Sequence, residues 1–234
     1  MTAPESALPA LADDRLARVA IAIEPVLNRV VLAGPPALEL LLNDSTERHL
    51  RLNFAADSVF QLLSTSMVDR LGLDLQRAGF TRVGRTSHAD RWHGAELTLE
   101  LIQVQTDGTT PRQLCLEYAT LLTHAIPVGP QLTIRSAVAP ALLALECTSF
   151  IESGTPVLES EELERVVLLI AGRAEIEKEC AAAPAELRAI IMESLSALVA
   201  TDALHLLVRR ALPDTAMLPA LAKRVRDRIV RMAC

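Results

Sequence analysis

The spacing of apolar residues changes from segment to segment along this chain, and each spacing predicts a different element. In residues 11–28, apolar side chains such as Leu16, Val19 and Ile23 recur every three or four positions, which predicts an amphipathic helix. Residues 30–33 read VVLA, a short apolar run that is typical of a buried strand. In residues 49–55 apolar and polar side chains alternate one by one, which predicts a half-buried strand.

The same criteria predict a mixture of helices and strands up to residue 138. In order, they predict a helix at 37–42, a helix at 67–78, strands at 80–85 and 91–105, and two strands between 120 and 136. Gly79 is a good stop for the second helix, and the Gly129-Pro130 turn separates the last two strands.

After Pro140 the pattern becomes helical. Helices are predicted at 141–151, 161–171, 184–200 and 218–232, with a further short one at 175–183. The simplest division is a flexible leader at 1–10, a mixed domain at 11–138 and a helical region at 139–234 packed on it. We therefore predict an α/β (α+β) protein with a mixed sheet domain followed by a helical C-terminal half.

Composition limits the classes of function. Half of the 234 residues are apolar but only one Trp, one Tyr and four Phe occur, so the core must consist of aliphatic side chains. The net charge of −6 argues against a protein that wraps nucleic acid over its whole surface. The four cysteines form no C-x-x-C pair, so neither a zinc site nor a disulfide framework is indicated. No segment reads as a signal peptide or as a membrane span, and we expect a cytoplasmic protein without a membrane partner.

Residues 30–57 carry the first signs of a known family. A short strand ends at Gly34, a helix follows, and residues 51–57 then read RLNFAAD. In this order the pieces resemble the nucleotidyltransferase superfamily, and most closely its abortive-infection (AbiEii-like) branch, where the turn is Gly-Gly or Gly-Ser and the next strand reads Arg-x-Thr-x-Asp-x-Asp. The resemblance implies a nucleotidyltransferase-like sheet domain followed by a helical half.

The C-terminal half carries further segments of the same resemblance, which covers roughly residues 15–230. Residues 134–146 and 160–165 match segments of that family, and residues 170–176 (IAGRAEI) match nearly letter for letter. Where the family has a Lys this chain has Glu146, and where it has the second Asp of a Ser-x-Asp-x-x-Asp segment this chain has Arg165.

Nucleotidyl transfer needs hard cations, and the resemblance implies where their ligands stand. Two Mg²⁺ ions about 4 Å apart stabilise the attacking and leaving oxygens, and carboxylates are their usual ligands. The three carboxylate positions fall on Ala55, Asp57 and Glu100, and an alanine cannot bind a metal. An active site would need a substitute for Ala55, such as Glu39 or Asp44.

Two interpretations of the site stay open. In an active enzyme Asp57 and Glu100 are the catalytic metal ligands, Mg²⁺ is the cofactor, and Gly34 and Arg51 contact the nucleotide. Otherwise Asp57 caps the following helix and Glu100 faces solvent.

Two further changes indicate weak phosphate binding. Residues 34–36 read GPP, so the turn keeps Gly34 but lacks the N–H donors that Pro35 and Pro36 cannot supply. Glu146 in place of Lys reverses a local charge and would repel a triphosphate.

We therefore predict a catalytically impaired protein, a pseudoenzyme, that binds a protein partner or a second copy of itself. The resemblance suggests a bacterial setting of phage defence or a toxin–antitoxin pair. NTP binding stays open, and nucleic acid is not supported as a partner. The alternative is an active Mg²⁺-dependent enzyme that moves NMP from an NTP to a protein or RNA acceptor.

Two other polar segments have simpler interpretations. Residues 88–93 read HADRWH, and an exposed loop between strands is favoured there over a metal or acid–base site. Residues 223–231 form a basic helix, for which a solvated face opposite an apolar stripe is favoured over a partner or nucleic-acid surface.

Overall fold

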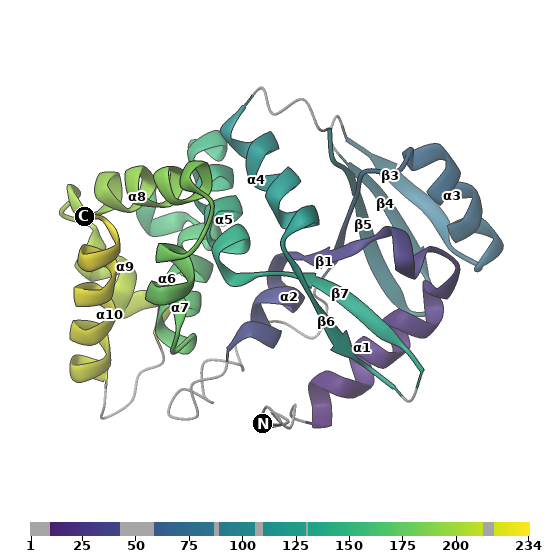
Figure 1. Cartoon of the computed structure of the whole chain (residues 1–234), viewed down its shortest axis with the longest axis horizontal. Helices are drawn as coiled ribbons and strands as arrows, with labels where there is room; N and C mark the ends of the chain where they lie inside the picture. Colours follow the sequence, from purple (N-terminus) through teal and green to yellow (C-terminus); the bar gives the residue numbers. More distant parts are fainter. Residues whose placement is uncertain (1–9, 43–58, 87–88, 106–109, 130, 213–217) are drawn as a thin grey trace.

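A mixed sheet and a group of helices make up the protein (Figure 1). The structure, a computed structural model, describes residues 10–42, 59–86, 89–105, 110–129, 131–212 and 218–234. Within these ranges seven strands form one sheet in the order β3-β4-β5-β2-β1-β7-β6. The strands are β1 (Val31–Ala33), β2 (Phe60–Ser64), β3 (Thr81–Arg85), β4 (Ala89–Gly94), β5 (Leu97–Gln103), β6 (Thr123–Pro127) and β7 (Thr133–Ala137).

The register of the central strands decides which side chains meet. β1 lies between β2 and β7, and all three of its residues are buried, as its apolar run predicts. β2 runs antiparallel to β1 and parallel to β5, with Gln61 opposite Glu100. Along β5 the leucines are buried while Thr98 and Glu100 are half-buried, so the alternation seen in the sequence separates the two faces of the sheet.

The helices of the first half surround this sheet. They are α1 (Ala10–Ala22), the 3₁₀ helix η1 (Glu24–Arg29), α2 (Gly34–Leu41), α3 (Val68–Arg77) and α4 (Pro111–Leu121). α4 contacts β1, β2 and β7 and also α5 and α8, so it joins the sheet to the second half. Thr110 begins α4 with a capping box, in which it and Gln113 each accept a hydrogen bond from the other's backbone N–H.

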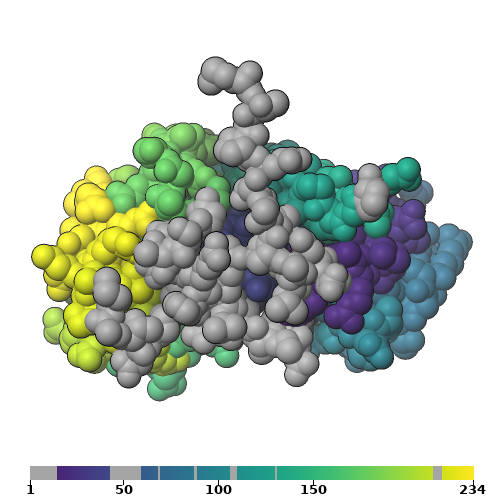
Figure 2. Space-filling model, turned by 90° about the horizontal axis from the view of Figure 1, so that it is seen from below, coloured from purple at the N-terminus to yellow at the C-terminus, as the bar shows by residue number. Residues whose placement is uncertain are grey.

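The second half is helical and forms the end of the molecule away from α3 (Figure 2). It consists of α5 (Ala139–Ser153), the 3₁₀ helix η3 (Val157–Glu159), α6 (Glu161–Gly172), α7 (Ile176–Ala181), α8 (Ala185–Val199), α9 (Leu204–Ala211) and α10 (Leu218–Met232). The first ten residues of α5 are all buried, because α4, α6 and α8 pack around it.

The predicted α/β (α+β) class is confirmed, but several elements differ from their predictions. The single strand predicted at 91–105 is wrong, because β4 and β5 form a hairpin whose turn residues Ala95 and Glu96 both have positive φ. Such turns usually carry Asn or Gly, so the sequence lacks the usual signal. The helix predicted at 11–28 ends at Ala22, and Glu24-Pro25 starts a 3₁₀ helix instead.

Four of the described elements were not predicted at all: β2, α4, η3 and α9. The strand predicted at 49–55 lies outside the described residues. The loop predicted at 88–93 is wrong for the part that is described, because this part lies in β4. Asp90 is buried there against Arg82, and Trp92 is buried as well.

The proposed division at residue 138 stays a prediction. β7 ends and α5 begins close to it, while α2 and α4 contact α5 across it. Among the described helices none is by itself long and apolar enough to cross a membrane, and one bent pair, α8 with α9 at 105°, meets the length and composition criteria only jointly.

Candidate functional site

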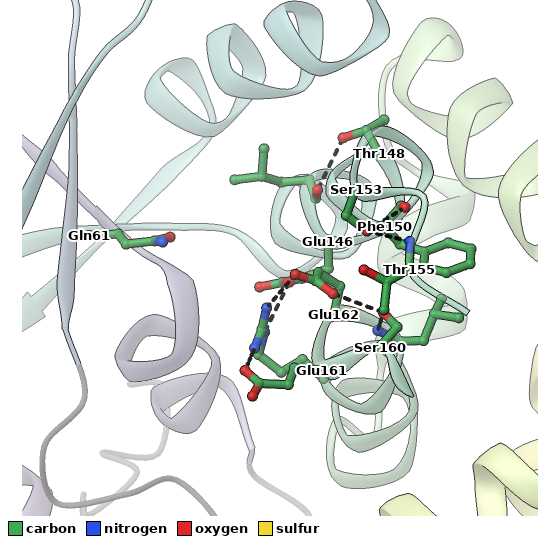
Figure 3. A network of polar contacts seen from close by, with 12 residues as sticks. Gln61, Glu146, Thr148, Phe150, Ser153, Thr155, Ser160, Glu161 and Glu162 are labelled. Carbon is green, nitrogen blue, oxygen red and sulfur yellow. Dashed lines mark hydrogen bonds and ion pairs between the residues drawn. The ribbon is translucent and has the colours of Figure 1, made fainter. Parts of the chain in front are cut away.

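A cleft of about 500 Å³ lies where the sheet meets the helical half. Its walls come from the start of α2, from β2, β4 and β5, and from α4, α5 and α6. Its charged and polar lining consists of Gln61, Thr86, Arg91, Glu100, Arg112, Glu146, Ser149, Glu161, Glu162 and Arg165. Figure 3 shows Gln61 on one side of this space and Glu146, Glu161 and Glu162 on the other.

Glu100 is held from two sides on the sheet wall. The Gln61 amide nitrogen donates a hydrogen bond of 3.0 Å to one Glu100 carboxylate oxygen, across the β2–β5 pair. The Arg91 guanidinium on β4 lies 3.7 Å from the other oxygen. Both oxygens of the Glu100 carboxylate therefore already face a protein donor.

The backbone of Gly34 packs against the Gln61 side chain. Its φ of +67° is in the left-handed region, and a Cβ at this position would lie 2.5 Å from the Gln61 side-chain oxygen. The backbone conformation therefore favours glycine, and a larger residue would also displace the Gln61 amide. α2 begins here, and Pro35 and Pro36 supply no N–H to its first turn.

The structure brings together two of the four residues that the sequence assigned to the site. Gly34 and Glu100 both contact Gln61, from α2 and β5 respectively. Arg51 and Asp57 lie outside the described residues, and their assignment stays a prediction.

The described part of the cleft does not fit a metal centre. In a strand, every second side chain lies on the same face. The residue two positions before Gln61 is Val59, which also lines the cleft and whose side chain cannot bind a metal. No group of three His, Cys, Asp or Glu among the described residues is arranged to hold a metal ion. Glu39, one substitute considered for Ala55, does not line the cleft, and Asp44 is not described.

The helical wall carries one guanidinium among three carboxylates (Figure 3). Arg165 Nε donates to a Glu146 oxygen at 3.0 Å, and its terminal nitrogens lie 3.5 Å from Glu161 and 3.7 Å from Glu162. Ser160 donates to Glu162 at 2.8 Å and also caps α6. Burial raises the pKa of the Glu146 carboxyl above its usual range, and the Arg165 guanidinium acts against this rise.

The Glu146–Arg165 pair changes how the substituted Lys position should be interpreted. The resemblance alone implies a Lys at position 146. The structure places the Glu146 carboxylate in contact with the Arg165 guanidinium. Glu146 is therefore paired and is not an isolated negative charge facing the cleft.

The other arginines of the cleft are also neutralised. Each arginine that lines the cleft in the described residues lies within 4 Å of a carboxylate: Arg91 of Glu100, Arg112 of Glu152, and Arg165 of Glu146. A phosphate entering the cleft would therefore compete with existing ion pairs for every guanidinium.

Gly172 and Arg173, within residues 170–176, connect α6 to the end of α2. A Cβ at Gly172 would lie 2.8 Å from Leu42, so glycine permits α6 to approach the end of α2. Arg173 donates to the Leu41 carbonyl at 3.1 Å and forms two hydrogen bonds to the Glu179 carboxylate, of 3.1 and 2.6 Å. This junction holds the C-terminal end of α2, whose first residue is Gly34.

Gln61, Arg91 and Arg112 are site residues that were not predicted from the sequence. Gln61 is the only polar side chain in the run Phe60–Leu63, and this could have marked it. The two arginines come from different elements, β4 and α4, which only the fold brings to the cleft.

Solved structures identify the class of fold. The chain is similar to the crystal structure of JHP933 from Helicobacter pylori, with a TM-score of 0.52 and 12% identity over 97% of this chain and 94% of that one. It is also similar to a candidate nucleotidyltransferase from H. pylori, with a TM-score of 0.50 and 11% identity over 97% and 96% of the two chains. The fold of this protein is therefore nucleotidyltransferase-like.

These comparisons do not reach a particular family. No model of a known protein family matches the sequence, and no curated protein matches it either. At such low identity the similarity of the structures shows the fold alone.

Proposed function

We propose that this nucleotidyltransferase-fold protein does not catalyse metal-dependent nucleotidyl transfer and acts by binding another protein. The observation that carries the proposal is that both oxygens of the Glu100 carboxylate already have protein partners. This carboxylate is the acidic group of the sheet wall in the described residues, and Gln61 and Arg91 face both of its oxygens.

Metal binding would require these contacts to be given up. A divalent ion needs several oxygen ligands, and two ions need bridging carboxylates. The side chain beside Glu100 is the Gln61 amide, which carries no charge and offers a metal one oxygen. In the observed arrangement that oxygen faces Gly34.

Phosphate binding is weakened independently. The turn at the start of α2 contains two prolines where backbone N–H groups would hold an anion. The three arginines of the cleft already have carboxylate partners. The cleft thus offers fewer groups to bind a metal ion and fewer groups to bind a phosphate. For this reason we favour a binding role over catalysis.

Large exposed apolar side chains occur on several elements. Among the described residues Leu121 on α4 and Ile151 on α5 are 65% and 62% exposed, and Met67 at the start of α3 is 63% exposed. They lie on three different elements, and single exposed apolar side chains do not by themselves mark an interaction surface. A role in bacterial defence or in a toxin–antitoxin pair belongs to this proposal on the strength of the AbiEii-like sequence segments alone.

Pyrophosphate release tests the loss of catalysis. The protein is incubated with each of the four NTPs, with Mg²⁺ or Mn²⁺, in the presence of bacterial RNA and protein acceptors. We expect the wild type to release no more pyrophosphate than the Glu100→Gln variant. Glu193→Gln is the matched control, because Glu193 is an exposed carboxylate on α8, remote from the cleft.

The active enzyme is the second candidate, and the same assay recognises it. Metal-dependent pyrophosphate release that Glu100→Gln and Asp57→Ala abolish, and that Glu193→Gln leaves intact, would overturn the proposal. Thermal melting provides a second measurement, because an NTP at about 100 times its Kd adds about 2.7 kcal/mol to stability. We expect no NTP-dependent rise in melting temperature.

A further inference from the structure

A groove between α9 and α10 lies in the helical half, apart from the cleft. Its volume is about 410 Å³. The apolar part of its lining is formed by Val208, Leu218, Pro219 and Ala222, and the polar part by His205, Arg209, Lys223 and Arg226. Figure 2 shows α10, in yellow, at one end of the molecule, and Figure 1 shows α3 at the other end.

The cations of this groove differ from their neighbours on the same helices. Arg210 on α9 pairs with Glu164, and Arg231 on α10 pairs with Glu177. In the described part of the chain, Arg209 and Lys223 are exposed and have no carboxylate within ion-pair distance. Arg226 has only Asp227, the next residue of its own helix, at 3.8 Å.

This local excess of positive charge runs against the charge of the whole protein. The chain has a net charge of −6, yet three cations surround one small apolar groove whose described lining contains no acidic group. Ion pairs neutralise the arginines on other faces of α9 and α10, as Arg228 and Arg231 show with Glu177. The groove is therefore complementary to a ligand that is both negatively charged and partly apolar.

We propose that this groove, defined by the eight residues above, binds an acidic peptide segment of the partner protein. Apolar side chains of the segment contact Val208 and Ala222, and its carboxylates pair with Arg209 and Lys223. The inference rests on the proposed function, since it names the surface by which a protein partner is recognised. An acidic peptide is favoured over single-stranded nucleic acid because half of the described lining is apolar, and the peptide can match both its charge and its apolar side chains.

Fluorescence anisotropy with defined probes tests this proposal. The first probe is a fluorescein-labelled peptide of about 12 residues with Glu and Leu at helical spacing. The second has Lys in place of each Glu, and the third is an oligothymidylate of similar length. The test variant is Arg209→Glu with Lys223→Glu. Its matched control is Arg18→Glu with Arg70→Glu, exposed arginines on α1 and α3 that change the net charge by the same amount.

We expect the acidic peptide to bind the wild type and the control variant equally, and the groove variant at least about tenfold more weakly. The basic peptide should not bind. Added salt should weaken binding, because the rim contacts are exposed ion pairs.

Three results would overturn the inference: equal loss of binding in both double variants, tighter binding of the oligothymidylate than of the acidic peptide, or no binding of the acidic peptide at millimolar concentration. The pyrophosphate assay on the same samples separates this failure from that of the proposed function. If the protein transfers nucleotides and still binds the acidic peptide, only the proposed loss of catalysis is rejected. If it neither transfers nucleotides nor binds the peptide, only the proposed role of the groove is rejected.

Discussion

Gly34 shows how a single residue joins the backbone of one element to the side chain of another. It starts α2 with a positive φ and lies against the Gln61 side chain, which in turn donates to Glu100. A larger residue there would meet two separate obstacles, a strained backbone and a displaced amide. The geometry of the sheet wall of the cleft therefore depends on this glycine.

Gly34→Ala should lower the free energy of unfolding by about 2–4 kcal/mol, because left-handed strain and the contact with Gln61 add together. Urea denaturation measures the loss. Gly79→Ala is the matched control, since Gly79 has a φ of +89° but nothing lies within 4 Å of the position that a Cβ would take there. It should therefore lose only about 1–2 kcal/mol.

Truncating Gln61 measures how much of the Gly34→Ala loss comes from the contact with its side chain. Because Gln61→Ala removes the atom that the new methyl would meet, the double variant with Gly34→Ala should lose less than the sum of the two single variants. Strict additivity would show that the amide does not contact the turn.

At the scale of elements, the C-terminal end of α6 is held by an arginine from α10. Arg228 is buried and donates to the carbonyls of Ile170, Arg173 and Ala174 and to the Glu177 carboxylate. Carbonyls at a helix end have no partner within the helix, so Arg228 supplies theirs. The basic run of the last helix, interpreted from the sequence as a solvated face, is thus partly structural.

Arg228→Met should destabilise the protein by about 3 kcal/mol, because it leaves three carbonyls and a carboxylate without this donor. Arg231→Met should cost less than about 1 kcal/mol, because Arg231 is exposed and pairs with the same Glu177. Chemical denaturation of both variants checks the difference. Equal losses would contradict the capping role.

The sequence predicted elements best where apolar residues recurred with the same period along the whole element. Helix α10 was predicted with the observed bounds, and α5, α6 and α8 to within two residues at each end. α4 was missed although Thr110, Pro111 and Gln113 carry a complete N-terminal signature, because its residues show no clear apolar stripe. β2, with five residues that are mostly buried, was also missed.

The site was less predictable than the fold because its residues meet through tertiary contacts. Glu100 and Gly34 were found through the resemblance, but the Gln61 amide that links them follows only from the β2–β5 register. The ion pair between Glu146 and Arg165 likewise depends on the packing of α5 on α6. The sequence alone shows two separate charged residues, and the structure shows that they form one ion pair.

At the scale of the whole molecule, several contacts join the two halves. α4 packs on the sheet and on α5, and Arg173 in the helical half donates to the end of α2. The single Trp of the chain, Trp92, is buried in β4 and reports on the sheet, while far-UV circular dichroism reports mainly on the helices. Trp92 fluorescence therefore follows the sheet, while the circular dichroism signal includes the helices after residue 138 as well as α1 to α4.

We expect thermal and urea unfolding curves from Trp92 fluorescence and far-UV circular dichroism to superimpose, since contacts that cross residue 138 would be lost in one cooperative step. Arg173→Met should lower both midpoints together, because it weakens the junction without removing the packing of α4 on α5. Two separate wild-type midpoints would instead show that the segments before and after residue 138 are independent folding units. In that case the cleft between them would be an interface between domains, where relative motion is the default expectation.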